Sequence, residues 1–239
     1  MLKLTQFIIF LFLLTVKVAL AQPAFAQPKS ILLEYEVTRD GKPFANVRET
    51  FVNDGKLYRI ESITKGIGIY ALFGERKLTS KGEVTNDGLK PSHFELHQGD
   101  NAKKSLITDF DWVNNTLNMQ VKGKIKTAIL EKGTQDLVSY AYQFMFSLAQ
   151  KNESKPDEVK VSLTTGKKLN QYQYKIIERG LMLEARNASY KTLHLSSAEG
   201  PDKKQLWLAE EQFYLPVRYM LTDENGATLT QTLTKIHVE

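Results

Sequence analysis

The sequence contains no cysteine, and this absence removes several kinds of chemistry at once. Disulfide bonds, cysteine nucleophiles, thiolate metal ligands and lipid attachment to an N-terminal cysteine are all excluded. Small secreted domains often depend on disulfides, whereas a chain of 239 residues is long enough to form a sizeable hydrophobic core without them. We therefore expect the core alone to stabilise the fold.

Long hydrophobic runs are absent except at the N-terminus. Residues 4–14 are almost entirely apolar, Lys3 precedes them, and two small-residue motifs that end at Ala21 and Ala26 follow. This order is typical of a cleavable secretory signal peptide. A membrane anchor is the alternative, but a span needs about 20 apolar residues and Lys17 interrupts this run. We expect cleavage after Ala26 or Ala21, and no integral membrane segment after processing.

Neither basic nor acidic residues predominate strongly in the chain. The chain has 32 basic and 27 acidic residues, interspersed along the sequence, and removal of residues 1–26 takes away two of the lysines. Such a mixed surface predicts a solvated protein and argues against nucleic acid as a partner. An exported chain without cysteine favours the bacterial periplasm as its location.

After residue 30 the dominant pattern is an alternation of apolar and polar side chains. Leu33, Tyr35 and Val37 alternate with polar residues, which is the period-two pattern of a half-buried strand. Asp40-Gly41 and similar pairs predict tight hairpins, because glycine tolerates the positive φ of these turns. The alternation predicts a mainly β fold, an antiparallel curved sheet or open barrel of about ten or eleven strands. It recurs in residues 117–122, 159–163, 172–176, 181–185 and 217–221.

Residues 134–150 break this pattern and predict one long helix. Leu137, Tyr140 and Phe144 fall at helical spacing, and Thr134 is the candidate N-cap. Because the opposite face is apolar too, we expect the helix to be buried inside the concave face of the sheet. The strand pattern on both sides of the helix predicts a single β-rich periplasmic domain, residues 27–239.

The segment between Gly66 and Gly74 is apolar but does not alternate. It contains Ile69, Tyr70, Leu72 and Phe73. One interpretation is a short loop that packs over the mouth of the barrel as part of the core. The other is a mobile apolar flap that binds a ligand or a partner, since exposed apolar patches often mark interaction sites.

Two pairs of polar residues are candidates for chemistry. His93 and His97 would share a helical face, but the alternating sequence around them predicts a strand, where they lie roughly 13 Å apart. That separation is too large for one metal ion, so we expect no metal site. Asp109 and Asp111 would face the same side of a strand, and a glycosidase needs carboxyl groups about 5 Å or more apart. This pair is the candidate for an enzymatic alternative.

Motifs for other catalytic classes are missing. The sequence has no Gly-x-Ser-x-Gly elbow and no phosphate-binding glycine loop between a strand and a helix. Gly66-Ile67-Gly68 matches only part of a dinucleotide-binding pattern, and no helix start follows it. We therefore expect no cofactor and no catalytic residues.

Several short motifs occur in order along the chain, at residues 35–37, 58–62, 87–91 with Phe94, 133–136, 206–209 and 214–218. Together they resemble the bacterial exported proteins known as domain of unknown function 3108. One departure is Asn187-Ala188-Ser189, where that family often has a glycine-containing turn. The resemblance implies a periplasmic β-rich protein and brings no established activity.

These observations favour a monomeric, non-catalytic envelope protein that binds an apolar or lipidic ligand or another envelope component. The first alternative is a cell-wall glycan hydrolase that uses Asp109 or Asp111. The second is a structural factor that maintains envelope integrity. The choice between these three functions depends on how the side chains are arranged in space.

Overall fold

A computed structural model describes residues 27–99, 105–149, 157–186, 188–197 and 202–239. The expected signal peptide and its cleavage sites lie outside the described residues. Among the described residues, no helix is long and apolar enough to cross a membrane.

The first half of the chain is a run of consecutive antiparallel strands. Each strand pairs with the next, so hairpins connect all of them in sequence order. The strands are β1 (Ser30–Arg39), β2 (Lys42–Asn53), β3 (Leu57–Gly66), β4 (Arg76–Thr85), β5 (Gly88–Gln98), β6 (Leu106–Asp111), β7 (Thr116–Val121) and β8 (Lys124–Ile129).

The second half begins with a two-residue strand and the helix α1 (Ser139–Ala149), after which the long strands again pair in sequence order. Its last strand pairs with β1, so one sheet of 15 strands runs from β8 to β9 through the central β1–β15 pair. The strands are β9 (Gln135–Asp136), β10 (Glu158–Thr164), β11 (Leu169–Ala185), β12 (Ala188–Ser197), β13 (Lys203–Ala209), β14 (Leu215–Thr222) and β15 (Thr228–Val238).

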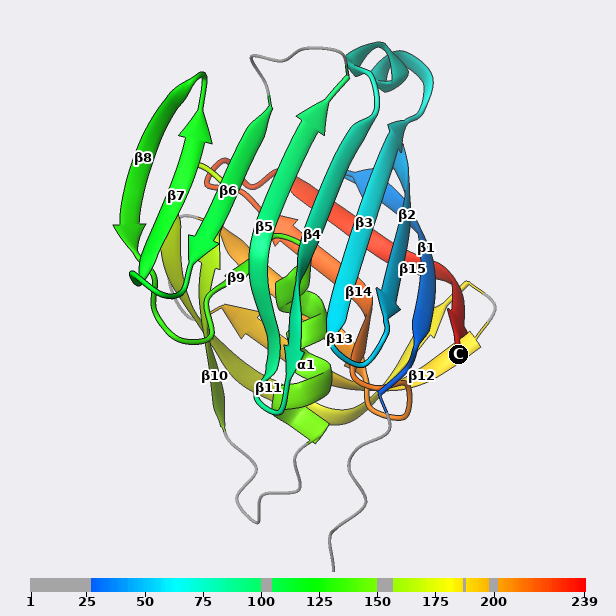
Figure 1. The fold of residues 1–239 in the computed structure, drawn as a ribbon. Coiled ribbons are helices and arrows are strands. Elements are labelled where there is room, and N and C mark those ends of the chain that lie inside the picture. Colours follow the sequence, from blue (N-terminus) through cyan, green and yellow to red (C-terminus); the bar gives the residue numbers. More distant parts are fainter. Residues whose placement is uncertain (1–26, 100–104, 150–156, 187, 198–201) are drawn as a thin grey trace, which may run out of the picture.

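The sheet folds back on itself around α1 but does not close into a barrel. Strands β2–β8 form one wall and β10–β14 form the opposite wall, with α1 between them (Figure 1). All described pairs are antiparallel except the two-residue pair of β9 with β10, which is parallel. The mainly β, antiparallel, curved sheet predicted from the alternation is therefore confirmed.

The predicted count of ten or eleven strands was wrong. Strand β8 has no buried residue, so it carries little of the alternation that reveals a strand. Strand β9 is only two residues long. Conversely, the two alternating segments 172–176 and 181–185 are one strand, β11, in which the register shifts on both sides of Arg179 and Gly180 adopts a φ of 73°.

The helix is shorter than predicted, and Thr134 does not cap it. The Thr134 hydroxyl instead donates to the carbonyl of Glu131. Asp136 is the residue at the helix start, since one of its carboxylate oxygens accepts hydrogen bonds from the amides of Val138 and Ser139. The Ser139 hydroxyl in turn accepts from the Asp136 amide, which makes a reciprocal capping arrangement. A second, short 3-10 helix, η1 (Gly68–Phe73), lies between β3 and β4.

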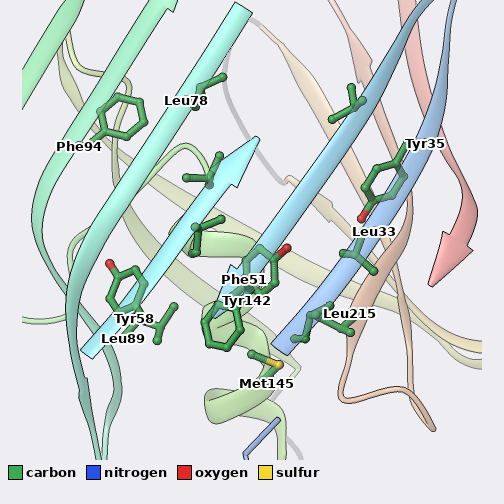
Figure 2. Close-up of a cluster of buried hydrophobic side chains, with 14 of the residues drawn as sticks. Leu33, Tyr35, Phe51, Tyr58, Leu78, Leu89, Phe94, Tyr142, Met145 and Leu215 are labelled. Carbon is green, nitrogen blue, oxygen red and sulfur yellow. The ribbon is translucent and has the colours of Figure 1, made fainter. Parts of the chain in front are cut away.

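Burial of the helix on both faces is confirmed. Tyr142 and Met145 point into the larger core cluster, where the Tyr142 ring stacks on Phe51 with centroids 5.1 Å apart (Figure 2). Phe144 lies on the other side of the helix, in a second cluster with Leu163, Tyr174 and further residues of β12 and β13. The helix therefore holds the two walls of the sheet together.

Candidate functional site

The inner face of the first wall can be followed row by row, because the strand register fixes which residues are neighbours. One row runs through Phe51, Ile60, Ser80, Phe94 and Thr108, all of them buried. This row lies against the helix and is fully packed.

The next two rows lead toward the end of the sheet where η1 lies, and they become more polar. The first of them contains Glu49, Ser62 and Leu78, and the second contains Thr64 and Arg76 in adjacent strands. At these rows the side chains leave space between the two walls unfilled.

A cavity of about 410 Å³ occupies this region between the two walls and the start of α1. We call it the helix-side cavity. Its volume lies within the range of small-molecule sites, roughly 300–1,000 Å³. It is lined by Tyr35, Val47, Glu49, Ser62, Thr64, Arg76, Leu78, Leu137, Val138, Tyr140, Ala141, Leu163, Thr165, Lys168, Tyr172, Asp202, Lys204, Leu206, Pro216, Tyr219, Leu221, Leu229 and Gln231.

The lining is mainly aliphatic and aromatic. Leu78, Leu163 and Leu206 are buried and come from three different strands on both walls. The Tyr35 hydroxyl donates to the carbonyl of Pro216 at 2.9 Å, so the phenol joins β1 to β14 across the cavity. Burial raises the pKa of Tyr35 well above its ordinary value, with a smaller contribution from Glu49, so this phenol stays neutral.

Glu49 is the buried acid of the cavity. Its side chain is 8% exposed, and one carboxylate oxygen accepts a hydrogen bond from the Tyr142 hydroxyl at 3.0 Å. Burial raises the pKa of Glu49, although hydrogen bonds from Ser62 and Tyr142 oppose that shift. The carboxyl group therefore contributes less negative charge to the cavity than an exposed glutamate would.

Cationic side chains lie at the same cavity. Arg76 is half-buried on its inner side, Lys168 is exposed at its rim, and the Lys204 ammonium lies 4.0 Å from the centre of the Tyr172 ring. Arg76 also lines a neighbouring cavity of about 540 Å³ that includes Gln98. The two cavities thus meet at Arg76.

Buried hydrogen bonds hold the start of α1 against the first wall. The Ser80 hydroxyl donates to Asp136 at 2.5 Å, and the Tyr58 hydroxyl contacts Ser80 at 3.0 Å. Burial raises the pKa of Asp136, while bonds from Ser80 and the helix amides lower it. The side-chain amides of Gln135 and Gln143 bond to the main chain of the β4–β5 hairpin. These contacts fix the position of the helix residues that line the cavity.

The predicted binding residues in η1 do not line the helix-side cavity. Ile69, Leu72 and Phe73 are 73%, 88% and 64% exposed, so the interpretation of this segment as core is wrong for these three side chains. Tyr70 is half-buried, and its ring lies 4.5 Å from that of Phe44. Whether the segment binds a ligand or partner stays a prediction.

The two histidines face the same side of β5, as expected, but a carboxylate connects them. Glu95 lies 2.7 Å from His93 and 3.0 Å from His97, and His93 also lies 2.6 Å from Asp109. Hydrogen bonds from His97 and His93 lower the pKa of Glu95 to about 2. Burial lowers the pKa of His93, but bonds to Glu95 and Asp109 outweigh this effect and raise it overall.

The cluster of histidines and carboxylates raises the question of a metal site. Within the described ranges, no group of three or more histidine, aspartate or glutamate side chains could hold a metal ion. The histidine–carboxylate cluster on β5 and β6 lies on the outer face of the sheet, away from the helix-side cavity.

The candidate carboxylates for glycan hydrolysis also lie on the outer face. Phe110 between them is buried, as the alternation predicted. Asp109 contacts His93, whereas Asp111 accepts hydrogen bonds from the amides of Val113 and Asn114 and so stabilises the turn after β6. Neither residue lines the helix-side cavity.

The cavity residues were not predicted from the sequence, because only the apolar positions of each alternating strand were considered. Glu49 has the same parity as Val47 and Phe51, so the pattern assigns it to the inner face. Arg76 likewise shares parity with Leu78. A charged residue at an inner position of a strand was the signal that could have revealed both.

An open antiparallel sheet wrapped around a buried helix, with a polar-ended cavity beside that helix, defines the structural class of the protein. The chain belongs to the family described as "Protein of unknown function (DUF3108)", which matches residues 33–234. Two of the motifs that carry the resemblance meet in space, since the Gln135 side chain donates to the carbonyl of Leu89 at 2.8 Å.

One solved structure supports the fold. A β-barrel-like protein of domain of unknown function DUF1849 from Brucella abortus aligns with a TM-score of 0.59 and 11% identity, covering 90% of this chain and 99% of its own. The Mycobacterium tuberculosis lipoprotein LppX aligns at a TM-score of 0.24 and 9% identity, over 87% of this chain and 86% of its own, which is too low to indicate a shared fold. No curated protein matches the sequence.

Proposed function

We propose that the protein is a non-catalytic periplasmic protein that binds an apolar or lipidic ligand in the helix-side cavity. The observation that carries this proposal is the cavity itself, since about 410 Å³ lies between two walls of one sheet beside a fixed helix. Binding sites are concave, mostly apolar and largely preformed, with a few polar groups that orient the ligand. The mainly apolar lining, with the buried Glu49 and the half-buried Arg76 among it, has this composition.

The envelope location rests on the sequence. A positive start, a short apolar run and two Ala-x-Ala motifs are typical of export. A volume of about 410 Å³ suits a single-chain amphiphile, and such molecules derive from the membranes that border the periplasm. A single domain acting as a monomer is sufficient for this role, because strands from both halves of the chain build the cavity together.

Native mass spectrometry of protein purified from its own periplasm tests the proposal directly. We expect a mass increment that organic extraction removes, together with a released amphiphile. In parallel, a fluorescent fatty-acid probe titrated into delipidated protein should show saturable binding at one site. Protein that carries no ligand and does not bind the probe would contradict the proposal and favour the structural-factor alternative.

A pair of variants localises the binding. Thr64 lines the cavity, so Thr64→Trp should fill part of it and weaken probe binding by about tenfold or more, as loss of roughly 1.4 kcal/mol implies. Its neighbour Ile63 has the opposite parity on β3, so Ile63→Trp places the same ring on the outer face and should leave binding unchanged. Equal effects of the two variants would exclude the helix-side cavity as the site.

A further inference from the structure

Arg76 differs from three other arginines of the sheet in its lack of a carboxylate partner. The guanidinium groups of Arg48, Arg59 and Arg186 lie within 3.5 Å of the carboxylates of glutamate residues on the outer surface. Arg76 has no hydrogen bond or ion pair with any of the residues that the structure describes, although it is half-buried against two cavities. Its neighbours across the register are Thr64 and Gln98, which are both neutral.

A desolvated cation without a counterion is unfavourable, and none of the residues that the structure describes supplies a negative charge to Arg76. Arginine stays charged in proteins, so it cannot avoid the penalty by losing its proton. Burial lowers the pKa of Arg76, in keeping with an environment that lacks a compensating negative charge. An anion that enters the cavity would supply that charge through the paired N–H donors of the guanidinium group.

The balance of charge around the cavity favours an anion. Arg76, Lys168 and Lys204 contribute three cations to the lining, against the two acids Glu49 and Asp202. Glu49 lies one row deeper than Arg76, and its carboxylate accepts a hydrogen bond from the Tyr142 hydroxyl, so it is already partnered. The cationic side of the cavity is therefore its outer side, toward the second cavity that shares Arg76.

We infer that the ligand is an anionic amphiphile whose headgroup binds at Arg76 and whose acyl chain lies along the leucines of the helix-side cavity. This inference rests on the proposed function and specifies its ligand class. The headgroup chemistry is a single carboxylate or phosphate, both of which match the planar guanidinium fork. Lys168 and Lys204 line the same cavity and add positive charge to it.

The test compares dodecanoate with its methyl ester, which has the same chain but no charge. Delipidated wild-type protein should bind dodecanoate about tenfold more tightly than the ester, as a charge-assisted contact implies. Arg76→Gln should remove this preference by weakening dodecanoate alone, and Arg76→Lys should restore part of it. Arg48→Gln, on the outer face of β2, is the matched control and should keep the full preference.

Each outcome decides between the two proposals. If the wild type binds both molecules equally, or if Arg76→Gln keeps the preference, the inference is wrong while the proposed function stands. If neither molecule binds, both fail. Dodecyl phosphate as a third ligand separates carboxylate from phosphate headgroups, since the stronger binder identifies the natural source. Thermal melts complete the test, because Arg76→Gln should leave the empty protein at least as stable as wild type.

Discussion

The helix is the element whose energetic role can be tested most sharply, through the substitution Phe144→Ala. Phe144 is 1% exposed and lies in the second core cluster, between α1 and the second wall. Its ring makes edge-on contacts with Tyr174 and a similar contact with Tyr140, at centroid distances of 6.4 and 6.3 Å. The substitution would remove this burial and both ring contacts.

The magnitude follows from these contacts. Phenylalanine-to-alanine changes in a packed core cost about 3–5 kcal/mol, from lost transfer free energy plus the cavity that remains. Each aromatic pair adds about 0.5–1.5 kcal/mol beyond burial, so the upper part of that range is expected here. The Asp136 network holds the helix start in place, so the helix cannot shift far to fill the space.

Urea denaturation followed by circular dichroism measures the change in the free energy of unfolding. Leu72→Ala is the matched control, because Leu72 is a large apolar residue that is 88% exposed and should change stability by less than about 0.5 kcal/mol. A loss below about 1 kcal/mol for Phe144→Ala, with an unchanged denaturant slope, would refute the conclusion that α1 joins the two walls.

Three further predictions concern export, the exposed η1 segment and the outer histidine cluster. N-terminal sequencing of protein from the envelope should find a mature chain that begins after one of the two Ala-x-Ala motifs; an intact membrane-bound precursor would contradict export by cleavage. If η1 is the apolar flap predicted from the sequence, Leu72→Asp and Phe73→Asp should weaken binding of an apolar probe or partner and change the melting temperature little, because both side chains are already in water. A large destabilisation, or an unchanged binding curve, would contradict the flap interpretation. His93→Gln should cost up to about 1 kcal/mol near pH 5 and almost nothing at pH 9. The pKa of His93 is raised, so its contribution to the free energy of unfolding is complete below about pH 6.5 and disappears as the pH rises through its folded-state pKa. The pKa of Glu95 is lowered to about 2, so its contribution is present above about pH 4.3 and disappears only as the pH falls toward 2. The charged groups around His93 are Glu95, His97, Asp109 and Lys81. Urea melts of wild type and variant at both pH values measure the difference, and a cost that does not change with pH would contradict this assignment.

Local pattern was enough to predict the elements that have one buried and one exposed face. Strand β1 shows this, since Leu33, Tyr35 and Val37 are buried as the alternation indicated. The helix was predicted from its spacing, but its start was placed too early, because Thr134 and Asp136 are both good caps and only the tertiary contact with Ser80 selects the second. Strand β8 carries little pattern, since it has no buried residue and only Ala128 packs against the core.

The candidate site could not be predicted from local sequence patterns, for a different reason. Glu49 and Arg76 are far apart in sequence and meet at the cavity only because β2, β3 and β4 are in one register. Residues such as Lys204 and Tyr219 reach the same cavity from the opposite wall. No short window of sequence contains this arrangement, which depends on the sheet folding back around α1. The η1 segment was recognised as unusual, but its exposure depended on how β3 and β4 end.

The pairing of β1 with β15 has a consequence for how the chain reaches this structure. Every other neighbouring pair of long strands is joined by a hairpin, so the two walls are built from contacts that are close in sequence. Of the described strand pairs, only the β1–β15 ladder joins residues about 200 positions apart, such as Leu33 with Ile236. Local contacts form quickly, whereas long-range closure is slow. We therefore expect each wall to form as a meander of its own, and the central seam to assemble last, so that the helix-side cavity takes shape only in the final step of folding.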